Sequence, residues 1–220
     1  MRRSAIGSSS RAVACGLAVL TVVGPGPFGA ANVRAQEVVS VSVAATLGAI
    51  APFSLIDQRG EPVTDEDFRG RFMLVYFGYT YCPDVCPLGL QRMSGAVEAL
   101  GPEAEQVVPI FITVDPERDS SSVLAAYTAH FHPRVIGLTG TRGQVDAARR
   151  SYGVRSFKVF LPPSFDEGES DEDDNSRYLM QHSASTYLVG PDGAIERVFP
   201  HETSSREMAR QIRGLVTGGL

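Results

Sequence analysis

The chain has 220 residues, of which 43% are apolar and 20% charged, with 22 glycines and 14 prolines. These values are typical of a globular protein and exclude collagen-like, coiled-coil and wholly disordered chains. The length suits one large domain better than two small ones. The net charge of −5 is not the basic balance that nucleic-acid-binding proteins normally show, so we expect no nucleic-acid partner.

Residues 1–35 have the composition of an export signal. They contain four arginines and no acidic residue, and an apolar run over 12–23 precedes the small-residue cleavage pattern Val33-Arg34-Ala35. We predict a signal peptide over 1–35. The alternative is an uncleaved membrane anchor, although a Gly-Pro-Gly-Pro sequence interrupts the apolar stretch. We therefore expect an exported protein, in the periplasm or at the outer face of the inner membrane.

The rest of the chain is interpreted as a linker over 36–50 and a single domain over 51–220. Short continuous apolar runs, typical of strands buried on both faces, alternate there with stretches of helical spacing. The predicted elements are a hairpin over 52–63, strands over 72–77, 107–114, 136–138 and 154–160, helices over 87–100, 119–131, 141–152 and 204–216, and a second hairpin over 184–199. This alternation predicts an α/β fold with a central sheet flanked by helices and an N-terminal hairpin extension.

Two cysteines, Cys82 and Cys86, lie between the strand predicted at the centre of the sheet and the following helix. A helix N-terminus stabilises thiolates, so this position favours reactive or metal-binding sulfur. The alternative is an inert disulfide, but a bridge that closes so short a loop adds little stability, and disulfide scaffolds need more cysteines. The pair is therefore predicted to have a chemical role.

A third ligand is most readily supplied by His182, which directly precedes the apolar strand of the second hairpin. If that strand runs antiparallel to the central strand, His182 lies beside the cysteines. Asp115 ends a parallel strand at the same edge of the sheet. Two thiolates and one imidazole suit copper, whereas structural zinc would also need Asp115 as a ligand. Capping or solvation is the ordinary interpretation of the other histidines, His130, His132 and His201.

Further segments accompany these residues in a defined order. They are Tyr76-Phe77-Gly78-Tyr79-Thr80, Cys82-Pro83-Asp84-Val85-Cys86-Pro87, Thr113-Val114-Asp115-Pro116-Glu117-Arg118-Asp119, Gly137-Leu138-Thr139-Gly140, His182-Ser183 and Tyr187-Leu188-Val189-Gly190-Pro191-Asp192-Gly193. Together they resemble the Sco/SenC family of thioredoxin-like proteins, which assemble the copper site of respiratory cytochrome c oxidase. The resemblance covers residues 51–217. It implies a thioredoxin-like fold with a central mixed sheet.

The resemblance also implies the site residues and the partners. Cys82, Cys86 and His182 would hold one copper ion, as copper(I) or copper(II), with Asp115 a nearby functional acid. The protein would deliver copper to the copper-receiving subunit of cytochrome c oxidase. A thiol reductant or another copper chaperone would be further partners, and membrane association stays open.

The alternative function is enzymatic: a thiol-disulfide oxidoreductase that keeps the cysteines of the oxidase subunit reduced by exchange through Cys82 and Cys86. Thioredoxins have two residues between their cysteines and a proline before the facing strand. This chain has three residues there and no proline in Gln181-His182-Ser183-Ala184, which favours metal binding. A thiol peroxidase is a third alternative. Its Thr-x-x-Cys pattern would need a threonine at position 79, where this chain has Tyr79, so the sequence does not favour it.

An acidic segment over 164–176 departs from the family pattern. Its nine residues Asp166 to Asp174 include seven carboxylates. Charges of one sign at this density resist packing, so we expect a solvated loop. Carboxylate oxygens are hard ligands that suit cations other than copper(I), so we expect the segment to be dispensable for binding the metal.

Overall fold

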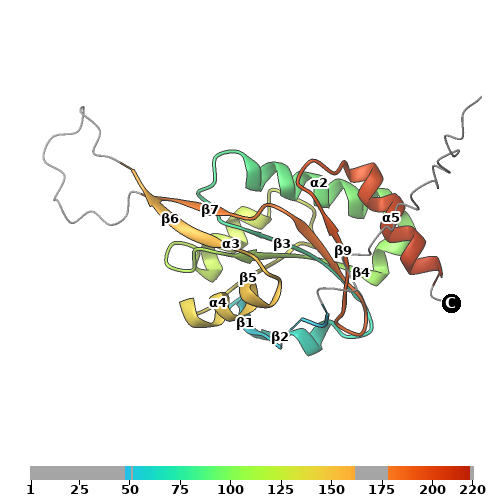
Figure 1. The fold of residues 1–220 in the computed structure, drawn as a ribbon, viewed down its shortest axis with the longest axis horizontal. Coiled ribbons are helices and arrows are strands. Elements are labelled where there is room, and N and C mark those ends of the chain that lie inside the picture. The colour runs from blue at the N-terminus through green and yellow to red at the C-terminus, as the bar shows by residue number, and fades with distance from the viewer. Residues whose placement is uncertain (1–47, 51, 162–177, 219–220) are drawn as a thin grey trace, which may run out of the picture. The chain divides into compact units, whose positions relative to one another are not determined.

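The computed structural model describes residues 48–50, 52–161 and 178–218 (Figure 1). They belong to one structural unit, Ser40–Leu220. The predicted signal peptide or anchor over 1–35, most of the predicted linker and the acidic segment lie outside the described residues. In the described ranges, no helix combines the length and the hydropathy that crossing a bilayer requires.

A seven-stranded mixed sheet forms the centre of this unit (Figure 1). In order across the sheet, its strands are β2 (Pro62–Thr64), β1 (Ser54–Asp57), β5 (Ile136–Thr139), β4 (Val107–Thr113), β3 (Phe72–Gly78), β8 (Thr186–Val189) and β9 (Ile195–Phe199). Strands β3, β4 and β5 run parallel, and β8 runs antiparallel to β3. Every residue of β3 and β4 is buried, as their continuous apolar runs predict.

The predicted N-terminal hairpin is confirmed. Strands β1 and β2 pair around a turn in which Gly60 has a φ of 88°, a backbone conformation that glycine adopts without steric cost. The Asp57 carboxylate closes this turn by accepting hydrogen bonds from the backbone N–H groups of Arg59 and Glu61. Because β1 also pairs with β5, the hairpin extends the main sheet at one edge.

Helices cover both faces of the sheet. They are α2 (Val85–Leu100), α3 (Ser121–Thr128), α4 (Arg142–Ser151) and α5 (Ser205–Gly218), and two short 3-10 helices cover Asp65–Phe68 and Gly101–Gln106. Side chains alternate along β3, so Tyr76 meets α2 on one face, while Phe77 packs 5.1 Å from the ring of Tyr152, at the end of α4, on the other. Figure 1 shows α2 and α5 above the sheet and α4 below it.

One strand was not predicted from the sequence. Strands β6 (Ser156–Phe160) and β7 (Tyr178–His182) form a separate two-stranded sheet, which we call the lateral hairpin. The sequence predicts β6 but no strand over residues 178–182, and His182, predicted only to precede the next strand, is the last residue of β7. The five residues of β7 mix apolar and polar side chains, and its partner β6 lies on the other side of the acidic segment, so no short hairpin turn marks the pair in the sequence.

The helix predicted over 119–131 is also shorter than expected. It covers Ser121–Thr128, and the side chain of Ser120, not that of Asp119, caps it by accepting a hydrogen bond from the backbone of Val123. The Asp119 carboxylate is unavailable for capping because two threonine side chains donate to it.

The packing of α2 on β3 predicts a strong effect of Gly89→Ala. A methyl group at this position would lie 2.6 Å from the ring of Tyr76, which is fully buried and cannot move aside. We expect the free energy of unfolding to fall by about 1–3 kcal/mol, measured by urea denaturation. Gly214→Ala is the matched control, because Gly214 lies in α5 with open space around it. That variant should gain about 0.5–1 kcal/mol. Equal effects of the two substitutions would contradict the packing argument.

Candidate metal centre

The two cysteines lie at the junction of β3 and α2. Cys82 is in the loop over residues 79–84, called the cysteine loop, and Cys86 is the second residue of α2. The backbone N–H of Cys86 donates a hydrogen bond to the Cys82 Sγ at 3.4 Å. A methyl group on Gly78 would approach the Cys86 Sγ to 2.9 Å. The glycine that ends β3 therefore makes room for the sulfur, and both cysteines are free thiols.

His182 joins the cysteines as the sequence predicts. Because β8 runs antiparallel to β3, the chain just before β8 lies next to the cysteine loop. The His182 Nε2 is 3.2 Å from the Cys86 Sγ, and the His182 Nδ1 donates to the Ser183 carbonyl oxygen at 3.0 Å. That second hydrogen bond leaves the Nε2 lone pair free for a metal ion. The ligand atoms of Cys82, Cys86 and His182 all lie within 4.8 Å of one another.

Buried aromatic rings enclose this cluster. The rings of Tyr76 and Tyr79 lie edge-on to the His182 ring, with centroid distances of 6.4 and 5.9 Å. Cys86 is fully buried, and Cys82 is 9% exposed. A pocket of about 260 Å³ opens over the cluster. It is lined by Tyr79, Cys82, Pro83, Asp84, Val85, Val159, Leu179, Met180, Gln181 and His182. The pocket is the route by which a ligand reaches Cys82 and His182.

The two cysteines have opposite protonation preferences. Hydrogen bonding from the Cys86 thiol, with a smaller contribution from His182, lowers the pKa of Cys82 to about 3 against the effect of burial. Donating that hydrogen bond, together with burial, raises the pKa of Cys86 above its ordinary value. The pKa of Cys82, at the pocket, therefore lies below that of Cys86, beneath it.

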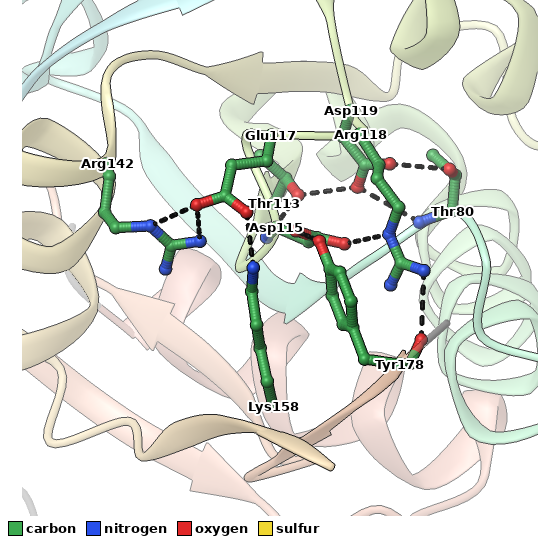
Figure 2. A network of polar contacts seen from close by, with 9 residues as sticks. All are labelled: Thr80, Thr113, Asp115, Glu117, Arg118, Asp119, Arg142, Lys158 and Tyr178. Carbon is green, nitrogen blue, oxygen red and sulfur yellow. Dashed lines mark hydrogen bonds and ion pairs between the residues drawn. The ribbon is translucent and has the colours of Figure 1, made fainter. Parts of the chain in front are cut away.

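Asp115 is buried next to the centre but does not belong to the ligand cluster found among the described residues. Its Oδ1 accepts a hydrogen bond from the Tyr178 hydroxyl at 2.7 Å, and its Oδ2 accepts one from the Arg118 Nε at 2.5 Å (Figure 2). Arg118 also donates to the Tyr178 carbonyl oxygen at 2.9 Å. Asp115 thus holds β7, the strand that ends in His182, and does not act as the fourth ligand that a zinc site would need.

Asp119 holds the cysteine loop in place by hydrogen bonds, as Asp115 holds β7. Its carboxylate accepts hydrogen bonds from the Thr80 backbone N–H at 3.1 Å, the Thr80 hydroxyl at 2.6 Å and the Thr113 hydroxyl at 2.6 Å (Figure 2). Burial nevertheless raises the pKa of Asp119. The loop over residues 114–120, called the aspartate loop, therefore contacts both segments that carry the candidate ligands.

Glu117 connects the aspartate loop to the other strand of the lateral hairpin. Its carboxylate pairs with Lys158 of β6 and with Arg142 of α4, each at 2.5 Å (Figure 2). The Lys158 Nζ also lies 4.1 Å from the centre of the Tyr178 ring. Sequence reasoning did not identify Tyr178 because its strand was not predicted. Asp119 is predicted from the sequence only as the cap of the following helix, a role that Ser120 performs instead, and no contact is predicted for Arg118.

The remaining histidines lie outside the ligand cluster of the described residues, as expected. The His132 Nδ1 accepts a hydrogen bond from the backbone of Arg134 at 3.2 Å, which is a capping role. The carbonyl oxygen of His201 accepts a hydrogen bond from Arg92.

The fold and the site together define a class. A mixed sheet with helices on both faces, and a cysteine pair where a central parallel strand enters its helix, define a thioredoxin-like protein. The family model described as SCO1/SenC matches residues 44–217, and the chain belongs to this family.

Individual relatives agree with this assignment. The mitochondrial protein SCO2 homolog of Mus musculus is 40% identical over 163 residues, which cover 73% of this chain and 60% of the mouse protein. The copper-bound structure of Arabidopsis thaliana ScoI is 32% identical, with a TM-score of 0.66, over 77% of this chain and 99% of that one. BsSco, described as a member of the Sco family of cytochrome c oxidase assembly proteins, is 25% identical, with a TM-score of 0.57, over 78% and 92% of the two chains.

The unequal cysteines predict selective alkylation. With its pKa lowered to about 3, Cys82 is a thiolate at every pH from about 5 to about 8, so its reaction with iodoacetamide should be fast and independent of pH in that range. Cys86 should not react. Mass spectrometry after limited alkylation measures both outcomes.

The controls remove the hydrogen bond from Cys86, or the folded structure itself, which lower the pKa of Cys82. In Cys86→Ala the pKa of Cys82 should rise, so that alkylation at about pH 5 slows, and in urea both cysteines should react with the pH dependence of an ordinary thiol, near a pKa of about 8.5. Preferential alkylation of Cys86 in the folded protein would contradict the assignment.

Proposed function

We propose that this protein binds one copper ion through Cys82, Cys86 and His182 and delivers it to the copper-receiving subunit of cytochrome c oxidase during assembly. The observation that supports this proposal most directly is that the sulfurs of Cys82 and Cys86 and an imidazole nitrogen of His182 lie within 4.8 Å of one another beside a pocket. Membership of the SCO1/SenC family and the copper-bound structure of the Arabidopsis relative support it.

The donor set fits copper as a cargo. Thiolates are soft ligands that favour copper(I), and three donors leave the set open to a ligand from another protein. Structural zinc is normally closed by four protein ligands, and the cluster in the described residues has three. Cys86 must release its proton before its sulfur binds a metal, so binding is coupled to pH. Copper is not a resident catalyst in this proposal.

The location and the partners follow from the same proposal. The acid-free, arginine-containing residues 1–35 support export to the periplasm or to the outer face of the inner membrane, with membrane association if they are retained. A second copper chaperone would load the site, and a thiol reductant would keep Cys82 and Cys86 reduced.

Thiol-disulfide exchange is the second candidate function. It is favoured by the position of Cys82, whose Sγ accepts a hydrogen bond from the Cys86 backbone N–H and lines a pocket open to a partner disulfide. The lowered pKa of Cys82 agrees with this position. The two functions can coexist in one protein, with the redox state of the cysteines controlling copper loading, because a disulfide offers no thiolates to copper. Oxidation of the pair would therefore prevent loading.

His182→Ala separates the two functions. Removing the imidazole takes away one of three copper donors but leaves both cysteines for exchange. Loss of a residue behind a metal ligand costs about 10–100-fold in affinity, so loss of the ligand itself should cost at least about 100-fold. We would measure copper(I) affinity by competition with a chelator, alongside the rate of disulfide exchange with a dithiol.

The controls distinguish a local from a general effect. His132→Ala should change neither quantity, because His132 only caps a turn, and Cys86→Ser should impair both. If His182→Ala binds copper as tightly as the parent protein but exchanges disulfides more slowly, the imidazole is an acid-base group and the assignment of His182 as a copper ligand is wrong.

The contact between Asp115 and Tyr178 predicts a smaller effect on the same site. Tyr178→Phe removes the hydroxyl that donates to Asp115 but keeps the ring that packs there. With β7 less firmly held, copper(I) affinity should fall by about tenfold, while alkylation of Cys82 is unchanged. Tyr152→Phe is the matched control, because the buried Tyr152 hydroxyl has no hydrogen-bond partner in the described residues. Equal affinities for the two variants would show that Asp115 does not position His182.

A further inference from the structure

Another pocket of the described structure lies at the opposite end of the main sheet from the candidate metal centre. It has a volume of about 320 Å³ and opens where the parallel strands β3, β4 and β5 begin. The cysteines follow the other end of β3, which is seven residues long. At about 3.3 Å for each residue of the strand, the two pockets lie roughly 20 Å apart. No residue lines both of them, so this pocket takes no part in binding copper.

Three arginines, Arg59, Arg71 and Arg134, line this pocket, which we call the arginine pocket. Asp57 is the acidic residue of its lining, and the Asp57 carboxylate is paired with the Arg59 Nε at 2.8 Å and the Arg59 Nη2 at 2.7 Å. The charges of Asp57 and Arg59 therefore balance each other. Arg71 and Arg134 leave an excess of positive charge in the pocket, although the chain as a whole has a net charge of −5. A local excess of this kind attracts anions.

The guanidinium groups of Arg71 and Arg134 are held in position and still have free donors. The Arg134 Nη2 donates to the Val107 carbonyl oxygen at 3.2 Å. The Arg71 Nη2 donates to the Asp67 carbonyl oxygen at 3.3 Å. Arg134 also lies 3.7 Å from the Glu105 carboxylate, but that side chain is 86% exposed, and surface pairs of this kind contribute little. Because a guanidinium group has five N–H donors, most of the donors have no partner among the described residues and are available to a ligand.

We propose that the arginine pocket binds a phosphate group. Guanidinium groups pair with phosphate oxygens through two parallel hydrogen bonds, which makes arginine a preferred residue for binding this anion. A metal cation is disfavoured, because the carboxylate in the pocket is already paired with Arg59. The volume of about 320 Å³ is near the lower limit of small-molecule sites, which measure about 300–1,000 Å³. The pocket therefore suits a phosphate that carries a small attached group. This inference does not depend on the proposed copper function.

The phosphate group has two sources, a small phosphate compound in solution and the headgroup of a phospholipid. The path of the chain makes the second source relevant. The Ile50 N–H donates to the Gly193 carbonyl oxygen at 3.0 Å, in the turn after β8, and β8 ends beside the beginning of β3. The chain therefore enters the domain at the same edge of the sheet as the arginine pocket. If residues 1–35 are retained as an anchor, this is the edge of the domain that they tether.

The first arm of the experiment measures the binding of inorganic phosphate by calorimetry. The full-length protein is compared with Arg71→Gln, Arg134→Gln and the control Arg150→Gln. Arg150 is an exposed residue of α4 outside the pocket, so its substitution changes the net charge equally. The affinity for phosphate should fall by about tenfold or more in both pocket variants, as expected for the loss of a hydrogen bond to a charged group. It should stay at the parent value in Arg150→Gln. Arg71 is exposed, so Arg71→Gln decides the result even if Arg134→Gln does not fold.

The second arm identifies the source of the phosphate. Cosedimentation of the same four proteins is measured with phosphatidylglycerol vesicles and with phosphatidylcholine vesicles, and binding to the second measures the contribution of residues 1–35. A preference for phosphatidylglycerol that both pocket variants lose assigns the headgroup as the ligand. Equal sedimentation of all four proteins, with weaker phosphate binding in the pocket variants, assigns a small phosphate compound.

The inference is wrong if the parent protein binds neither probe, or if Arg150→Gln weakens binding as much as Arg71→Gln does. Copper(I) affinity is measured in parallel and should be equal in all four proteins, because the metal centre lies roughly 20 Å away. Failure of phosphate binding therefore leaves the copper function intact, and failure of copper binding leaves the arginine pocket intact.

Discussion

Two buried carboxylates in one short loop hold the metal centre together. Asp115 and Asp119 are both fully buried, and a buried charge is strongly destabilising unless hydrogen-bond donors surround it. The donors come from the two ligand-bearing segments: Thr80, before the cysteines, and Tyr178, in the strand that ends at His182. The hydrogen bonds that the two buried carboxylates need therefore form only when the two ligand-bearing segments come together. Folding the aspartate loop brings Cys86 and His182, 96 residues apart in the sequence, to within 3.2 Å of each other.

The centre combines a rigid part with a peripheral part. Cys86 sits on a helix fixed to the middle of the sheet by the close contact of Gly89 and Tyr76. His182 sits at the end of a two-stranded sheet that pairs with no strand of the main sheet. Glu117 and Asp115 hold that small sheet by polar contacts to Lys158 and Tyr178. The hairpin thus carries the third candidate ligand on the side that faces the domain, while Phe157, Val159 and Leu179 on its other side are exposed.

Much of this arrangement could be predicted from the sequence, because it depends on local patterns. The continuous apolar runs predict β3 and β4, the turn at Gly60 predicts the first hairpin, and the position of Cys82 and Cys86 follows from the strand and helix around them. His182 was placed next to the cysteines by assuming an antiparallel strand, and the register of β8 on β3 confirms it. Strand β7 could not be predicted, because its partner β6 lies across the acidic segment. The role of Asp115 as a support depends on Tyr178 of that same strand and was missed for the same reason.

The candidate ligand His182 and the chain connection between the two strands lie at opposite ends of the lateral hairpin. His182 pairs with Ser156 at the base of the hairpin, and Tyr178 pairs with Phe160 at its far end. Four residues of strand, at about 3.4 Å each, separate the ligand from the point where the chain leaves the pair. Residues added between Phe160 and Tyr178 do not change the register that places the imidazole. The far end of the hairpin is therefore where natural insertions would accumulate at little cost to the centre, and where an affinity tag or a fluorescent reporter could be inserted with the ligand geometry preserved.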